Sequence, residues 1–292
     1  MGEKMESSSL LSEGKELIKK GDYEQAEKKF QEALKQFTQD NNINGIAESE
    51  TYLGIGLQYQ NKLKKAKEHF ETALKLHEEL DYKPGISRNY TNLGNLSLLI
   101  DKDFEKSIEL HEKALEIAKE ARDLPGESRA LTNIGYVKFR QQKLEESLTE
   151  LEKALELANK ASYENTKAIA LSNIGIILFT MKRYEEALEK HKEVVGIFEK
   201  WGNKKRLAIE HRQMGLILEK LKKFKEAAEY YKIAEKLYDE IGQKREKKMM
   251  KSMLEISKTR ERKCQSCGAS IMVPDLKYCP ICDKDLKTVT EK

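Results

Sequence analysis

The chain has 292 residues, of which 36% are charged, 39% are hydrophobic and only 7% are aromatic, and its formal net charge is +4. This composition favours helices with a large solvated surface over a compact β-sheet protein. No apolar run approaches the roughly 18 residues that a membrane-spanning helix needs, and the N-terminus lacks the apolar stretch of a signal peptide. We therefore expect a cytoplasmic protein that does not bind membranes.

A glycine recurs along most of the chain at a spacing of 40 residues, with one interval of 41. The glycines are Gly14, Gly54, Gly94, Gly135, Gly175 and Gly215. A small residue follows each of them after twelve residues (thirteen in the third repeat), and a bulky residue follows four later. The small residues are Ala26, Ala66, Ser107, Ser147, Ala187 and Ala227, and the bulky ones are Phe30, Phe70, His111, Leu151, His191 and Tyr231. Small residues let two helix backbones approach closely while bulky ones fill the groove beside them, so each repeat predicts a pair of packed helices.

The predicted elements follow this period in chain order. We place a tail at residues 1–6 and six repeats at 7–46, 47–86, 87–127, 128–167, 168–207 and 208–247. Polar turns within repeats are expected at residues 21–22, 61–62 and 182–183, and breaks between repeats at 41–45, 83–85 and 124–126, because Pro and Gly are unfavourable inside helices. The inserted residue of the third repeat is placed in the turn at 101–103. One hairpin cannot bury its apolar face alone, so neighbouring hairpins must stack.

The order of Leu-Gly, a small residue, a bulky residue and a second small residue resembles the tetratricopeptide repeat. Its 40-residue period is similar to the variety found in kinesin light chains and Pins-type adaptors, and the stretches GISRNYTNLGN (85–95) and GESRALTNIG (126–135) lie close to that consensus. The resemblance implies an all-α, right-handed superhelical solenoid of six helix-turn-helix repeats. It also implies a non-enzymatic scaffold or adaptor that binds a peptide segment of a partner protein along its inner face.

The residues that would form this inner face can be identified from the helical period. If the first helix of a repeat has thirteen positions with the glycine eighth, the sixth position points well away from the apolar stripe and shares its side with the second and ninth. We call these three positions the predicted binding face, and the sixth-position residues the amide row. The face comprises Arg88, Asn92, Asn95, Arg129, Asn133, Tyr136, Asn173 and Gln213, of which Asn92, Asn133, Asn173 and Gln213 form the amide row.

The chemistry of these residues suits an extended peptide. Each amide offers donors and an acceptor to a peptide backbone, and Arg88 and Arg129 could hold an acidic side chain of the partner bidentately. The resemblance implies the same role, because Asn at this position is a frequent backbone clamp in the family. An alternative is that the amides brace adjacent repeats, since buried amides also find partners. The fifth position holds Thr91 and Thr132, where a chaperone-type carboxylate clamp requires Lys, so recognition of a chaperone C-terminus is not expected.

All four cysteines lie in one short segment, with the spacing Cys264-x2-Cys267-x11-Cys279-x2-Cys282. Two C-x-x-C knuckles predict one tetrahedral, structural Zn²⁺ with no open position for catalysis. The segment resembles the short zinc-ribbon modules of many archaeal and bacterial proteins, and we place the ribbon at residues 263–285 and a tail at 286–292. Two disulfides, a rubredoxin-like iron site or a redox C-x-x-C are alternatives, which the lack of an export signal, the short loop and the absence of a βαβ unit disfavour.

A basic capping helix is expected at residues 248–262, between the repeats and the ribbon. We expect it to cover the last repeat with Met249, Met253, Leu254 and Ile256. The segment 242–263 carries a net charge of +6, which exceeds the +4 of the whole chain, and its basic residues include Lys247, Lys248, Lys251, Lys258, Arg260 and Arg262. A solvated cap face explains them. The alternative is a nucleic-acid-associated regulator in which residues 242–285 contact RNA or DNA, which the lack of interleaved aromatic residues disfavours.

No residues suggest an enzyme or a small-molecule substrate. His111 and His191 occupy the bulky slot and are expected to be core histidines. His69, His77 and His211 show no spacing with carboxylates that would make a metal site or a triad, and no phosphate loop or nucleophile elbow is present. Beside the adaptor and the nucleic-acid regulator, a third hypothesis is an architectural solenoid that self-associates.

Overall fold

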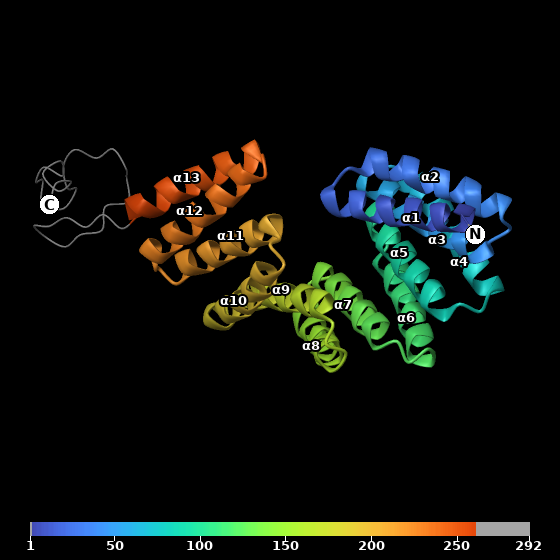
Figure 1. Ribbon diagram of the computed structural model, residues 1–292. Coiled ribbons are helices and arrows are strands. Elements are labelled where there is room, and N and C mark those ends of the chain that lie inside the picture. Colours follow the sequence, from blue (N-terminus) through green and yellow to red (C-terminus); the bar gives the residue numbers. More distant parts are fainter. Residues whose placement is uncertain (1, 261–292) are drawn as a thin grey trace, which may run out of the picture. The chain divides into compact units, whose positions relative to one another are not determined.

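The computed structural model describes residues 2–260, which form thirteen α-helices and no strand (Figure 1). The helices are α1 (Gly2–Lys20), α2 (Tyr23–Gln39), α3 (Ile43–Tyr59), α4 (Leu63–Glu79), α5 (Lys83–Ile100), α6 (Phe104–Glu120), α7 (Leu124–Arg140), α8 (Leu144–Lys160), α9 (Glu164–Thr180), α10 (Tyr184–Lys200), α11 (Lys204–Lys220), α12 (Phe224–Glu240) and α13 (Lys244–Arg260). The all-α repeat architecture predicted from the sequence is thereby confirmed for this part of the chain.

The chain forms two compact units, which divide within α9 after Lys167. In the first unit every helix from α1 to α8 packs against the next, and α1, α3, α5 and α7 also contact one another in series. The odd-numbered helices therefore form one layer of this unit. In the second unit α10, α11, α12 and α13 pack in the same sequential way.

The turns between helices share one backbone form, which recurs at half the sequence period. Each contains a single residue with positive φ: Gly21, Asn41, Asn61, Asp81, Lys102, Arg122, Gln142, Ser162, Lys182, Gly202, Lys222 and Gly242. The residue after it closes the preceding helix through its backbone N–H, and at several turns its side chain also caps the next helix. Asp22, for example, donates its backbone N–H to the carbonyl of Leu17 at 3.0 Å, and its side chain accepts from the N–H of Gln25 at 3.2 Å. This arrangement satisfies orphan groups of two helices at once.

Two of the expected features of the turns are wrong. Pro84 and Pro125 do not lie in breaks between helices, because α5 begins at Lys83 and α7 at Leu124. Proline is tolerated in the first turn, since the backbone N–H of a residue there has no intrahelical acceptor. The inserted residue lies within α5, which has 18 residues where α3 and α7 have 17. The turn at 101–103 keeps the common form, with positive φ at Lys102.

The ends of the described region also differ from expectation. Helix α1 begins at Gly2, where a tail to residue 6 was expected, and α13 (Lys244–Arg260) begins four residues before the expected start at 248. The expected end of this helix at residue 262 lies outside the described residues. Of the expected capping residues, Leu254 is buried, but Met249 and Ile256 are 40% and 47% exposed. The buried face of α13 is set by the one-turn spacing of Met250 and Leu254, both of which lie inward.

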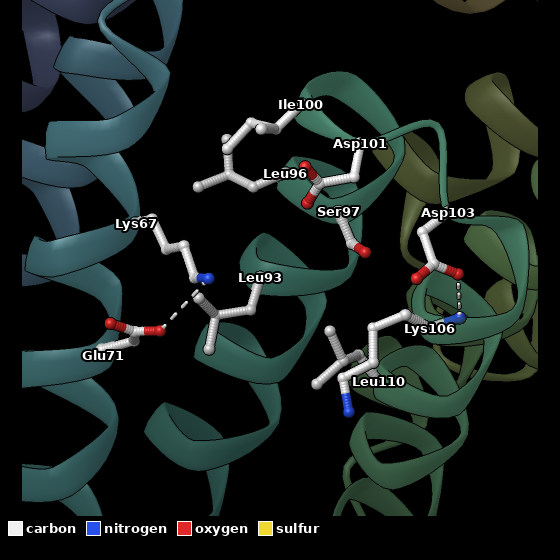
Figure 2. Close-up of a pocket in the computed structure, with 10 residues that line it drawn as sticks. All are labelled: Lys67, Glu71, Leu93, Leu96, Ser97, Ile100, Asp101, Asp103, Lys106 and Leu110. Atoms are coloured by element: carbon white, nitrogen blue, oxygen red, sulfur yellow. Dashed lines mark hydrogen bonds and ion pairs between the residues drawn. The ribbon is translucent and has the colours of Figure 1, made fainter.

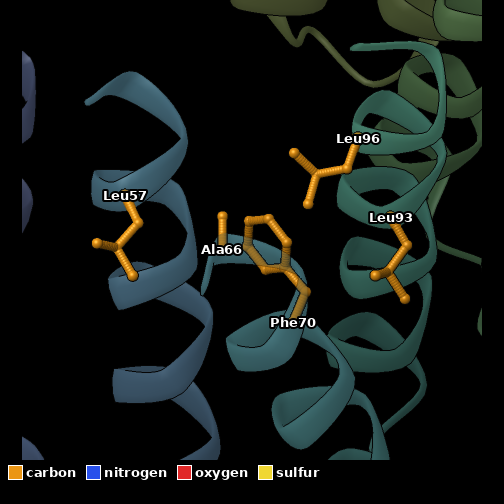
Figure 3. Close-up of a cluster of buried hydrophobic side chains, with 5 residues drawn as sticks. All are labelled: Leu57, Ala66, Phe70, Leu93 and Leu96. Atoms are coloured by element: carbon orange, nitrogen blue, oxygen red, sulfur yellow. The ribbon is translucent and has the colours of Figure 1, made fainter. Parts of the chain in front are cut away.

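The glycine, small and bulky positions of each repeat meet in its core. All six small residues are fully buried, and no bulky residue is more than 1% exposed. The second repeat shows the arrangement (Figure 3): Leu57 of α3, Ala66 and Phe70 of α4, and Leu93 and Leu96 of α5 form one cluster. Each repeat glycine faces its own bulky residue so closely that a methyl group would clash, as for Gly54 against the Phe70 ring. The predicted close approach of the two helices is therefore confirmed.

Candidate peptide-binding face

In the first unit the predicted binding face lies on α5 and α7, which contact one another. Most side chains of this face are partly exposed, so a ligand can reach them. Half-buried are Asn92, Asn95, Arg129 and Asn133, and Tyr136 is exposed. The side-chain Nδ2 of Asn92 is buried and has no hydrogen-bond partner, and within residues 2–260 no side-chain hydrogen bond is made by Asn133 either. Two adjacent amides thus have free hydrogen-bonding capacity.

A different asparagine braces the repeats. Asn89 is fully buried, accepts a hydrogen bond from the Thr51 hydroxyl at 3.2 Å, and places its Nδ2 2.9 Å from Nδ1 of His77. It also donates to the carbonyl of Gly85 at 3.1 Å. This network joins α3, α4 and α5, and sequence reasoning missed it. Its repeat position could have indicated that it is buried, because the third position of the first helix is buried in every repeat from Ser49 onwards.

The two arginines of the face differ in what they can offer a ligand. Nη1 of Arg88 donates to the Glu48 carboxylate at 2.8 Å, and the same carboxylate lies 3.6 Å from Nζ of Lys15. Arg129, at the equivalent position one repeat later, has no ion-pair partner among the described residues. Arg88 is therefore already neutralised, which the sequence did not predict, and Arg129 keeps its charge available. Tyr136 accepts a hydrogen bond from Nη1 of Arg140 at 3.1 Å.

In the second unit the same face becomes apolar. Asn173 of α9 and Gln213 of α11 are half-buried, and isoleucine occupies the second position of both helices, at Ile169 and Ile209. A pocket of about 210 Å³ opens here, which the sequence did not predict. It is lined by Ile176, Phe179, His191, Gln213, Leu216 and Ile217.

Beside this pocket lies a buried polar network that links α9, α10 and α11. His191 and Glu210 are each only 1% exposed, and Nδ1 of His191 lies 2.6 Å from the Glu210 carboxylate. The Ser172 hydroxyl donates to the other carboxylate oxygen at 2.9 Å. His191 is thus the core histidine that was expected, but its carboxylate partner was not anticipated.

A second hollow, of about 200 Å³, lies in the first unit among α4, α5 and α6 (Figure 2). Leu93, Leu96 and Leu110 form much of its wall, and charged groups stand around it. Its two lysines are paired: Nζ of Lys67 lies 3.8 Å from Glu71, and Nζ of Lys106 lies 2.9 Å from Glu109. The hollow includes no residue of the predicted binding face.

The other predicted sites are only partly covered by the structure. Cys264, Cys267, Cys279 and Cys282 lie outside the described residues, and within residues 2–260 no cluster of His, Cys, Asp or Glu could hold a metal ion. On α13, Lys247 pairs with Asp239 at 2.8 Å and Lys258 with Glu255 at 3.0 Å. Lys248 and Lys251 are exposed and have no ion-pair partner among residues 2–260. No helix in the described region is long and apolar enough to cross a membrane.

Comparison with known proteins identifies the repeat. The family model of the tetratricopeptide repeat matches residues 17–79, 45–120, 85–160, 126–200 and 166–240. The chain belongs to the tetratricopeptide repeat family. Tetratricopeptide proteins typically act as non-enzymatic, protein-binding scaffolds. The match includes residues of both units. The resemblance to the kinesin-light-chain variety and the right-handed superhelix stay predictions.

Solved structures share the tetratricopeptide fold at low sequence identity. The apo form of RapI is 17% identical, with a TM-score of 0.59 over 87% of this chain and 97% of that one. A Rap protein complexed with Competence and Sporulation Factor is 12% identical, with a TM-score of 0.65 over 87% and 75%. BtubC (BKLC) from P. vanneervenii is 16% identical, with a TM-score of 0.59 over 83% and 93%. No curated protein matches the sequence.

Proposed function

We propose that this tetratricopeptide protein is a non-enzymatic adaptor whose predicted binding face holds an extended peptide segment of a partner protein. The observation that carries the proposal is the free amide pair of Asn92 and Asn133 on neighbouring helices. A buried Nδ2 without a partner is costly, and a peptide carbonyl would satisfy it. The bracing alternative is less well supported, because Asn89 performs that role in the same helix.

Two further features bear on the partner. A Rap protein of this fold is known in complex with Competence and Sporulation Factor, which supports ligand binding by such a scaffold. A preference for acidic partners rests on Arg129 alone, because Arg88 is held by Glu48. Arg129 could receive a carboxylate bidentately at the edge of the amide pair.

The double substitution Asn92→Ala and Asn133→Ala should weaken peptide binding by about fivefold to a hundredfold. Each lost hydrogen bond is worth about 0.5–1.5 kcal/mol, and about 1.4 kcal/mol is a factor of ten in Kd. Peptides would be selected from a displayed random library on the native protein, and their affinities measured by fluorescence anisotropy. Asn159→Ala on α8, an exposed asparagine, is the matched control and should bind like the native protein.

Two outcomes would contradict this function. The library could yield no peptide that binds the native protein, or the selected peptides could bind both the double variant and the control with native affinity. Circular dichroism must show equal helicity for all three proteins, so that a lost affinity cannot result from unfolding.

We further propose that the four cysteines bind one structural zinc ion. Native mass spectrometry should find one Zn²⁺ per chain, and Cys267→Ser with Cys282→Ser should abolish it, because each C-x-x-C knuckle then loses one thiolate. The repeat helices should unfold at an unchanged temperature in that variant, since the ligands follow the repeats in sequence. Free, alkylatable thiols without metal in the native protein would exclude the zinc site.

A further inference from the structure

The pocket of the second unit combines an apolar wall with two polar groups. Ile176 and Phe179 come from α9, and Leu216 and Ile217 come from α11. His191 of α10 and Gln213 of α11 supply the polar part of the lining. Gln213 makes no side-chain hydrogen bond within the described residues. A small number of polar groups in an apolar pocket is the usual composition of a ligand site.

The His191 ring has one nitrogen in use and one free. Its Nδ1 must carry a hydrogen in order to bond Glu210, because an ionised carboxylate only accepts hydrogen bonds. Its Nε2 has no partner among the described residues, although the side chain is only 1% exposed. Because His191 lines the pocket, this nitrogen is available to a hydrogen-bonding group of a bound ligand.

Packing does not require this histidine. The same slot holds Leu151 in the preceding repeat, and the position equivalent to Glu210 then holds Ala170. Both of these residues are fully buried, so each of the two positions accepts an apolar side chain. His191 and Glu210 therefore place hydrogen-bonding groups at two positions where the fold also accepts apolar residues.

The ligand that fits is a neutral amide with an apolar side chain. A peptide bond offers both an N–H and a carbonyl, so it can bond Nε2 of His191 whether that nitrogen accepts or donates. A carboxylate is disfavoured, because moving its charge from water into a pocket with four apolar wall residues is costly. The four apolar residues of the wall would surround a side chain of the size of Leu or Phe.

We propose that this pocket is a specificity site for one large apolar residue of a bound peptide, whose backbone is held by His191 and Gln213. The proposal rests on the peptide-binding function proposed above. It adds a side-chain preference, because the amide row by itself reads only the peptide backbone. The second unit would then select an apolar residue, whereas the first unit offers the amide pair and Arg129.

The test uses the full chain with isotope-labelled isoleucine methyl groups and the probe N-acetyl-leucinamide. NMR titration should give saturable shifts of the Ile176 and Ile217 methyl signals, with a Kd on the order of 1 mM for so small a ligand. N-acetyl-alaninamide and N-acetyl-leucine, which carries a free carboxylate, should each bind at least tenfold more weakly. The first lacks the apolar side chain, and the second would carry a charge into the apolar pocket.

Two variants separate the polar and apolar parts of the pocket. His191→Leu with Glu210→Ala copies the Leu151 and Ala170 pair, so it should fold and bind the leucinamide probe at least tenfold more weakly. Leu216→Trp should fill the pocket and abolish the shifts. Gly196→Ala on α10, whose added methyl group meets nothing within 4 Å, is the control and should bind like the native protein.

Each outcome decides between the proposals. If the leucinamide probe gives no saturable shifts, or if the His191 and Glu210 double variant binds it with native affinity, the specificity site is wrong. Library peptides that need Asn92 and Asn133 would still support the peptide-binding function in that case. If the probe binds as expected but no library peptide binds, the pocket stands as a site for small apolar amides and the adaptor function fails.

Discussion

Replacing His111 with leucine is expected to stabilise the protein at neutral pH and to remove a large part of its sensitivity to acid. His111 is fully buried, and neither of its ring nitrogens has a hydrogen-bond partner. An unsatisfied buried polar group costs about 1–3 kcal/mol, and leucine carries none. Leu151 fills the equivalent slot in the next repeat, so the substitution should fit. The free energy of unfolding at pH 7 should therefore rise by about 1–3 kcal/mol.

The effect of acid follows from the pKa of this histidine. Burial lowers the pKa of His111 from 6.5 to about 4 in the folded state. Between these two values the unfolded chain binds a proton that the folded chain excludes, so stability is complete above pH 6.5 and falls as the pH falls towards 4. The loss from this one group is about 3 kcal/mol, because one pKa unit corresponds to about 1.4 kcal/mol.

Urea unfolding followed by circular dichroism at pH 7, 5.5 and 4 would measure both effects. The difference between native protein and His111→Leu isolates this residue, because the other histidines are common to both. That matters because burial also lowers the pKa values of His77 and His211. If the two proteins lose equal stability between pH 7 and pH 4, His111 is not excluded from protonation in the folded state.

Replacing Gly54 with alanine should destabilise the second repeat by about 1–3 kcal/mol, the usual cost of overpacking a core. The added methyl group would lie 2.5 Å from Cε1 and 2.6 Å from Cδ1 of Phe70. That ring cannot move away freely, because it packs in the cluster with Leu57, Leu93 and Leu96. The two helices would have to separate. The close approach that the small Ala66 allows would then be lost.

Gly196→Ala is the matched control for this substitution. Gly196 is an exposed residue inside α10, and an added methyl group would meet nothing within 4 Å. Alanine should therefore stabilise the protein there by about 1 kcal/mol, the difference in helix propensity. Opposite signs for the two substitutions in urea unfolding would show that close approach sets the identity of the repeat glycine. A gain in stability for Gly54→Ala would contradict the packing described.

The repeat itself could be predicted from sequence because its packing depends on residue size at fixed spacing. Gly54, Ala66 and Phe70 must be small, small and large for their two helices to touch, and the same pattern recurs in each repeat. The turns were less predictable. Their positive-φ position holds Gly, Asn, Asp, Ser, Gln, Lys or Arg, so residue type carried little signal and the prolines at 84 and 125 were misassigned to them.

The roles of individual polar residues depended on the tertiary structure. Asn89 and Asn92 lie three residues apart on one helix, yet one is fully bonded and the other has a free Nδ2. Arg88 and Arg129 occupy the same repeat position, yet among the described residues Arg88 has a carboxylate partner and Arg129 has none.

The sequence by itself determined the helical repeat and the small and bulky core positions within it, because these depend on local period and side-chain volume. It did not determine which polar groups pair. Those partners come from the adjacent repeat, 40 residues away for Arg88 and Glu48 and 38 for Ser172 and Glu210. A hydrogen bond forms only when packing brings two atoms within about 3 Å. The repeat conserves the place of each residue but not the chemistry of its neighbour, so only the folded structure separates a free amide or arginine from a paired one.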